Sequence, residues 1–201
     1  MIKMVPQPIV DLKTGQVVIE EWLCRPIGQS VQEYFSTSDV ETLWEREAAC
    51  IQQALKQEST VPKAINITLS SLPYFLETSW EWEGALEITE WGPRQYDIFR
   101  LLPIIIPKIK ERGMQIWVDD ITPSSWLQWK FQKMDGYKIS LADFKDECMV
   151  ERFINEIIKR HKPIILEWID QENLVRKARG WGINLGQGLI FEKNLKFANT
   201  Y

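Results

Sequence analysis

Short apolar runs alternate with longer amphipathic stretches along this chain. Runs rich in β-branched residues predict buried strands, and apolar positions three or four residues apart predict helices. Two strands, Gln7–Asp11 and Gln16–Cys24, flank a Thr14-Gly15 turn and predict an opening hairpin. Beyond the hairpin, predicted strands alternate with predicted helices. This order favours a parallel sheet, and so many units in one domain favour a closed β/α barrel.

The remaining elements follow from the same patterns. The predicted strands are Ala64–Leu69, Leu86–Thr89, Met114–Val118, Tyr137–Ile139, Pro163–Leu166 and Leu189–Phe191. One helix begins at Ser38, where Glu41 three residues later completes a capping box. Further predicted helices are Ser70–Glu77, Gln95–Arg112, Ser125–Gln132, Asp143–Arg160 and Gln171–Arg179. Pro103 and Pro107 must kink or restart the predicted helix Gln95–Arg112.

Composition narrows the class of protein. The 201 residues, 45% of them hydrophobic, suit one domain spanning residues 1–201 with a sizeable core. The formal net charge of −4 argues against nonspecific binding to DNA or to a membrane surface, because such binding would need a basic face. An acidic protein can still bind a phosphate ester if metal ions supply the positive charge.

Cysteine usage and apolar segments predict a cytoplasmic protein. The three cysteines are widely separated and there is one histidine, which argues strongly against a Cys/His zinc site. Buried or half-buried thiols in a reducing cytosol are the expectation. The N-terminus lacks a signal-peptide core, and the longest apolar stretch, Leu101–Ile109, is too short to span a bilayer.

Carboxylates recur within or just past the predicted strands, among apolar neighbours. They are Glu21, Glu87, Glu90, Asp119, Asp120 and Glu167. A carboxylate at the C-terminal end of a barrel strand points into the mouth of the active site. Several gathered there repel one another and are costly to desolvate unless cations neutralise them. Hard oxygen ligands suit Mg²⁺ or Mn²⁺, so the set predicts a metal site.

Two other polar residues join this set. Asn66 lies in the predicted strand Ala64–Leu69 and adds a neutral carbonyl oxygen, and Lys138 is placed to orient or neutralise an anion near the metals. A salt bridge from Lys138 to one of the carboxylates is compatible with that role. A single strand-end carboxylate is more often a helix cap or a loop residue than a ligand, so the prediction depends on the whole set.

Seven short motifs in chain order resemble those of EAL domains. The opening Gln7–Asp11, followed by Glu21-Trp22-Leu23-Cys24-Arg25, is similar to the QPIVD and EALLR motifs, with EWL in place of EAL. The other six are Ile65–Ser70, Leu86–Glu90, Val118–Asp120, Tyr137–Ile139, Glu167–Asp170 and Gly186–Phe191. The resemblance implies a TIM-like (β/α) barrel that opens with a hairpin and has an antiparallel first strand.

The resemblance also implies a function in bacterial signalling, the metal-dependent hydrolysis of cyclic di-GMP to linear pGpG. By this resemblance the first metal ion would be held by Glu21, Asn66, Glu87 and Asp119, with Asp120 helping a second. Glu167 would be a further metal-site carboxylate and the general base, and Lys138 would position the attacking water. A homodimer is expected from the resemblance alone.

The resemblance assigns three supporting roles as well. Arg25 would contact a substrate phosphate, Gln187 would close the site, and Glu90 would anchor the loop that follows Asp120.

Several positions depart from the family pattern. Ile121-Thr122-Pro123-Ser124 stands where the family has a glycine-containing stretch, Ser140 replaces an aspartate, and Trp168 and Asp170 replace a glycine and a glutamate. The retained ligand set favours the enzyme. The departures favour an inactive EAL-like protein that acts as a cyclic-di-GMP receptor or as a regulator with a protein partner.

Overall fold

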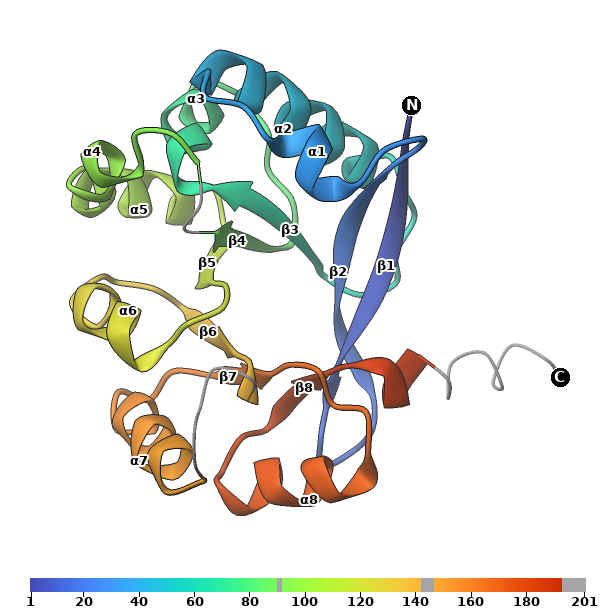
Figure 1. Cartoon of the computed structure of the whole chain (residues 1–201), viewed down its shortest axis with the longest axis vertical. Coiled ribbons are helices and arrows are strands. Elements are labelled where there is room, and N and C mark those ends of the chain that lie inside the picture. The colour runs from blue at the N-terminus through green and yellow to red at the C-terminus, as the bar shows by residue number, and fades with distance from the viewer. Residues whose placement is uncertain (90–91, 142–146, 193–201) are drawn as a thin grey trace, which may run out of the picture. The chain divides into compact units, whose positions relative to one another are not determined.

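The structure is a computed structural model in which residues 1–89, 92–141 and 147–192 are described (Figure 1). Its strands are β1 (Ile2–Asp11), β2 (Val17–Pro26), β3 (Lys63–Thr68), β4 (Gly84–Thr89), β5 (Gln115–Val118), β6 (Gly136–Ile139), β7 (Ile164–Leu166) and β8 (Leu185–Gln187). They are ordered β1 to β8 in one closed barrel. The strand β1 pairs with β8 in antiparallel fashion, while the pairs β2–β3, β3–β4, β6–β7 and β7–β8 are parallel. The predicted barrel and its antiparallel first strand are confirmed.

Helices follow most strands. They are α1 (Val31–Phe35), α2 (Val40–Leu55), α3 (Leu72–Leu76), α4 (Gln95–Phe99), α5 (Leu102–Lys110), α6 (Pro123–Trp129), α7 (Glu147–Ile158) and α8 (Glu172–Gly180), with one 3₁₀ turn, η1 (Leu69–Ser71). No helix among the described residues is both long enough and apolar enough to cross a membrane.

The chain divides into two compact units. The first unit comprises Met1–Pro6 and Glu20–Trp117, and the second comprises Gln7–Ile19 and the described part of Val118–Tyr201. In the first unit, β3 is hydrogen-bonded to β2 on one side and β4 on the other. The second unit holds β6, β7, β8 and the end of β1 that pairs with β8.

Two local features agree with the sequence predictions, the turn after β1 and the interruption of the long predicted helix. At the hairpin, the Asp11 carboxylate accepts hydrogen bonds from the backbone N–H groups of Lys13 and Thr14, at 2.9 and 2.8 Å. In the predicted 95–112 helix, α4 ends at Phe99 and α5 restarts at Leu102. Pro103 then occupies the first turn of α5, where a backbone N–H has no intrahelical partner.

Two sequence predictions were wrong in detail, and one short helix was missed. The N-cap of α2 is Asp39 rather than Ser38, because the Asp39 carboxylate accepts from the Thr42 N–H at 2.8 Å. The short helix α1 was not predicted, although Ser30 and Glu33 form its capping box. Residues 189–191 begin a helix rather than a strand.

The last of these errors has its cause in a close contact at Gly188. Its backbone has a φ of 153°, and a Cβ there would lie 2.3 Å from the backbone N of Ile169. Only glycine allows the chain to turn this close to Ile169, and the turn ends β8 after Gln187. An apolar run of three residues cannot by itself distinguish a strand from the first turn of a helix.

Glu47 fixes the end of β3 from the neighbouring helix α2. Its side chain is 4% exposed, and its two oxygens accept hydrogen bonds from the Thr68 N–H at 2.8 Å and the Thr68 hydroxyl at 3.2 Å. Burial raises the pKa of Glu47 to about 7, although hydrogen bonds from Ser71 and Thr68 oppose the rise. The protonated carboxyl is therefore favoured by folding.

This pKa predicts a pH-dependent stability that a Glu47→Gln variant should lack. Between about pH 4.5 and pH 7 the folded state retains a proton that the unfolded state releases, so the free energy of unfolding falls as pH rises through this window. The expected loss is about 3 kcal/mol relative to the variant. Urea denaturation of both proteins at a series of pH values measures the difference, and parallel curves would contradict the assignment.

Candidate functional site

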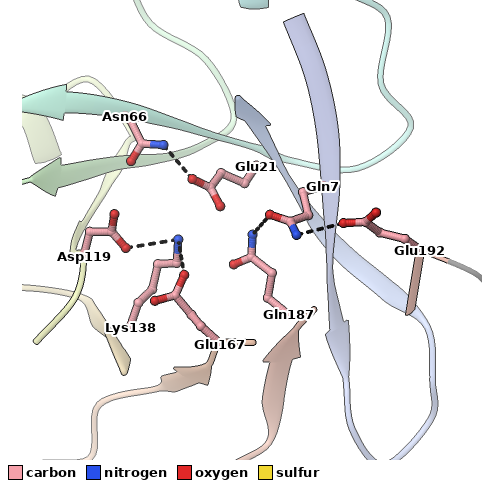
Figure 2. Close-up of polar contacts among 8 residues, drawn as sticks. All are labelled: Gln7, Glu21, Asn66, Asp119, Lys138, Glu167, Gln187 and Glu192. Carbon is pink, nitrogen blue, oxygen red and sulfur yellow. Dashed lines mark hydrogen bonds and ion pairs between the residues drawn. The ribbon is translucent and has the colours of Figure 1, made fainter. Parts of the chain in front are cut away.

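The first group of site residues lies on the three neighbouring strands of the first unit. Glu21 on β2 is opposite Ala64 on β3, and Asn66, two residues further on β3, is opposite Glu87 on β4. Side chains two residues apart share one face of a strand, so all three side chains project from the same face of the sheet. The Asn66 amide Nδ2 donates to Glu21 Oε1 at 2.6 Å (Figure 2).

Burial makes this group electrostatically costly. Glu21 is 3% exposed and Glu87 is fully buried. The Asn66 Oδ1 atom is buried and has no hydrogen-bond donor in the part of the chain that the structure describes. Such an oxygen, beside two buried carboxylates, has the character of a ligand for a hard divalent cation. The oxygen atoms of Glu21, Asn66 and Glu87 therefore fit the divalent metal ion that the sequence predicts.

The second group is built around Lys138 in the second unit. Lys138 lies on β6 and is 1% exposed. Its Nζ atom lies 3.0 Å from Glu167 Oε1 and 3.1 Å from Asp119 Oδ1 (Figure 2). The contact with Asp119 is an ion pair without the angles of a hydrogen bond, since Asp119 Oδ1 has no hydrogen-bond partner. Lys138 therefore forms two salt bridges with these carboxylates, the kind of contact that was expected from the sequence.

Backbone pairing explains why these three side chains meet. Asp119 directly follows β5, and Glu167 directly follows β7. Ile139 accepts a hydrogen bond from the Glu167 N–H at 3.0 Å, which continues the β6–β7 pairing past the end of β7. Lys138 is opposite Ile165, two residues before Glu167, so both side chains project from one face.

Asp119, Asp120 and Glu167 form an acidic cluster. One oxygen from each lies within 4.8 Å of the others, a spacing that could hold a metal ion. Glu167 Oε2 is buried and receives no hydrogen bond within the described residues. Burial raises the pKa of Glu167 to about 7; the Lys138 ammonium opposes the rise, and the Asp119 and Asp120 carboxylates add to it. A carboxylate with this pKa is suited to accept a proton near neutral pH.

The stretch after Asp120 is held by the neighbouring strand. Asp120 has a left-handed φ of 47°, and the Ile121 N–H then donates to the Lys138 carbonyl at 2.9 Å. The Ile121 side chain is fully buried, and Thr122 caps helix α6, whose first turn contains Pro123. The stretch Ile121–Ser124 thus consists of a buried anchor, Ile121, followed at once by the cap and first turn of a helix. Ser140, 5% exposed, directly follows β6.

The remaining predicted residues occupy separate places. Gln187 is 3% exposed, and its amide donates to Gln7 Oε1 at 2.9 Å. Arg25 is exposed, and its guanidinium donates to the Cys24 carbonyl at 3.0 Å. Glu90 lies outside the described residues.

Sequence reasoning assigned no role to three residues that the structure places at these groups. Gln7 bridges Gln187 and Glu192, donating to Glu192 Oε1 at 2.8 Å (Figure 2). Trp168, directly after Glu167, is 73% exposed with a left-handed φ of 56°. A left-handed backbone costs a non-glycine residue about 1–2 kcal/mol, so Trp168 is held in an unfavourable conformation. The sequence did hold one signal for this conformation, because Trp168 stands where the EAL motif has a glycine.

The structure resembles solved structures of EAL proteins, whereas no family model and no curated protein matches the sequence. A standalone EAL protein of Vibrio cholerae, bound to cyclic di-GMP, matches with a TM-score of 0.74 and 16% identity over 94% of this chain and 90% of its own. The YkuI protein of Bacillus subtilis has an EAL domain and was solved with its substrate cyclic di-GMP and calcium. It matches with a TM-score of 0.73 and 22% identity over 93% of this chain and 53% of its own.

A third match is BlrP1 of Klebsiella pneumoniae, in a complex with manganese and cyclic di-GMP. Its TM-score is 0.67 and its identity is 18%, over 94% of this chain and 54% of its own. This chain therefore spans about half the length of YkuI and BlrP1. At these identities the likeness concerns the fold, and the fold of this chain is that of EAL domains.

Proposed function

We propose that this protein is a metal-dependent phosphodiesterase that hydrolyses cyclic di-GMP to linear pGpG. The observation that carries the proposal is the Lys138 cluster, in which a buried ammonium and three carboxylates gather just past β5 and β7. A structural salt bridge would need one carboxylate per ammonium. Three carboxylates within a few ångströms leave negative charge uncompensated, which favours an additional cation.

The proposal assigns the oxygen ligands in each unit. Glu21, Asn66 and Glu87 in the first unit, and Asp119, Asp120 and Glu167 in the second, would hold one or two ions of Mg²⁺ or Mn²⁺. Bound there, such ions would lower the pKa of a water molecule and stabilise charge on the phosphate oxygens.

The chain's own groups would handle the proton and the charge. Glu167, with its pKa near neutrality, would accept the proton of the attacking water. Lys138 would orient that water and would keep Glu167 and Asp119 in place, because both of its ion pairs are already formed. Arg25, exposed at the end of β2, would contact a substrate phosphate, and Gln187 would be oriented by Gln7.

A cyclic-di-GMP receptor without turnover is the second candidate. It is favoured by Ser140, which offers no carboxylate where the family has one, and by the buried Ile121 anchor, which leaves the following stretch little freedom to complete a second metal site. In that case the protein would bind the nucleotide without hydrolysing it, and a protein partner would recognise the nucleotide-bound form.

Turnover separates the two candidates. Purified protein with Mg²⁺ or Mn²⁺ should release pGpG, and excess EDTA should abolish the release. Glu167→Gln should lower kcat about 100-fold or more, because a general base contributes on that order. Glu156→Gln, on the exposed face of α7, is the matched control and should leave kcat unchanged. Product is followed by chromatography; nucleotide binding with no pGpG in either metal would instead support the receptor.

Metal affinity should depend on pH through Glu167. A proton and a metal ion compete for its carboxylate, so Mn²⁺ affinity should fall as pH drops below about 7, by up to about tenfold per pH unit. Calorimetric titration at about pH 6 and about pH 8 measures the fall. Glu167→Gln should flatten the dependence, and an identical dependence in this variant would exclude Glu167 as a ligand.

Trp168 should stack on a guanine base of the nucleotide. It is an exposed aromatic directly after Glu167, and its backbone is held in a left-handed conformation. Since a base–aromatic stack is worth about 1–3 kcal/mol, Trp168→Ala should weaken cyclic-di-GMP binding about 5- to 150-fold. Phe131→Ala removes an equally exposed ring past the end of α6 and should have no effect. Fluorescence or calorimetric titration with metal present measures both; equal affinities would rule out the stack.

A further inference from the structure

The thiols of Cys24 and Cys50 lie side by side in the first unit. Their sulfur atoms are 2.7 Å apart, although 26 positions separate them in the chain, and Cys50 donates its S–H to Cys24. Cys24 lies on β2 and Cys50 on α2. Disulfide sulfurs are about 2.05 Å apart, so the pair needs to close by only about 0.7 Å.

The two thiols differ in environment. Cys50 is 5% exposed and packs with Phe35 and Leu43 in a buried cluster, while Cys24 is half-buried at the edge of that cluster. The hydrogen bond from Cys50 lowers the pKa of Cys24, and the Arg25 guanidinium lowers it further. The same hydrogen bond, together with burial, raises the pKa of Cys50. Cys24 is thus the less shielded of the two thiols and the more inclined to be a thiolate, while Cys50 is buried and holds its proton.

This asymmetry is what a peroxide-sensing dithiol requires. The thiolate is the nucleophile in sulfur chemistry, and a neighbouring second cysteine intercepts the oxidised sulfur before further oxidation. Cys148, the third cysteine, is exposed and lies on α7 in the second unit, so it belongs to neither role.

We propose that Cys24 and Cys50 form a redox-active pair that closes to an intramolecular disulfide when the protein meets a hydroperoxide. The Cys24 thiolate attacks one peroxide oxygen, the O–O bond breaks, and Cys24 becomes a sulfenic acid while the departing oxygen takes up a proton. The Cys50 sulfur then attacks the Cys24 sulfur, its proton leaves with the hydroxyl as water, and the S–S bond forms. For hydrogen peroxide, two thiols and one peroxide yield one disulfide and two water molecules.

The disulfide is detected by thiol counting and peptide mapping. Hydrogen peroxide treatment of the full chain, followed by alkylation, should leave Cys148 as the only free thiol of the three and yield a Cys24–Cys50 cross-linked peptide that dithiothreitol reverses. Cys148→Ser should keep the cross-link. Three persistent free thiols, or oxidation confined to Cys148, would overturn the proposal.

Two matched variants test the order of the steps. In Cys50→Ser the Cys24 sulfenic acid has no partner, so dimedone should trap it at Cys24. In Cys24→Ser no dimedone adduct should form at Cys50, because that thiol is buried and protonated. Adducts at Cys50 with none at Cys24 would contradict the assigned roles.

Thermal unfolding supplies an independent measurement. A cross-link over this length of chain should raise the unfolding midpoint by about 5–10 °C in the oxidised protein, and the rise should be absent in Cys24→Ser and Cys50→Ser. An equal or lower midpoint in the oxidised protein would show that the native positions do not accommodate the bond, and would count against the proposal.

Discussion

A lysine ammonium at 1% exposure needs negative charge beside it, and this requirement organises the ends of three strands. Lys138 meets it with Asp119 after β5 and Glu167 after β7. Backbone hydrogen bonds hold the same segments together, because the Lys138 carbonyl accepts from the Ile121 N–H and the Ile139 carbonyl accepts from the Glu167 N–H. Removing the ammonium would leave several carboxylates facing one another without a counter-charge. The acidic cluster depends on the Lys138 ammonium, and the turn at Asp120 is held by the Lys138 backbone carbonyl.

Most of the strand and helix order could be predicted because most elements carry their own signal. Alternating apolar runs, the Thr14-Gly15 turn and the two prolines of α5 are local features, and local features survive folding unchanged. The positions of the site residues on strands were predictable for the same reason, since the end of a parallel strand is visible in the sequence. Their chemical roles stay predictions, and Glu90 lies outside the described residues.

The rest could not be predicted because it depends on contacts between distant segments. Glu47 reads as one more polar position on an amphipathic helix, and only the end of β3 gives its carboxylate a partner. The sulfurs of Cys24 and Cys50 meet because α2 packs on β2, which no spacing rule reveals. Residues 189–191 became helical because Gly188 must pass close to Ile169, a constraint imposed by tertiary structure. In each case a tertiary contact decided what a local pattern left open.

Strand β2 carries two kinds of chemistry on opposite faces. Side chains alternate along a strand, so Glu21 and Arg25 project to one side while Cys24 projects to the other, toward Cys50 of α2. A covalent event at the sulfur therefore adds no atom to the face that bears Glu21. Its influence there would be mechanical, carried by a shift or stiffening of a backbone that both faces share. Control of this type would change the orientation of a side chain on the other face of the strand without changing its chemical composition.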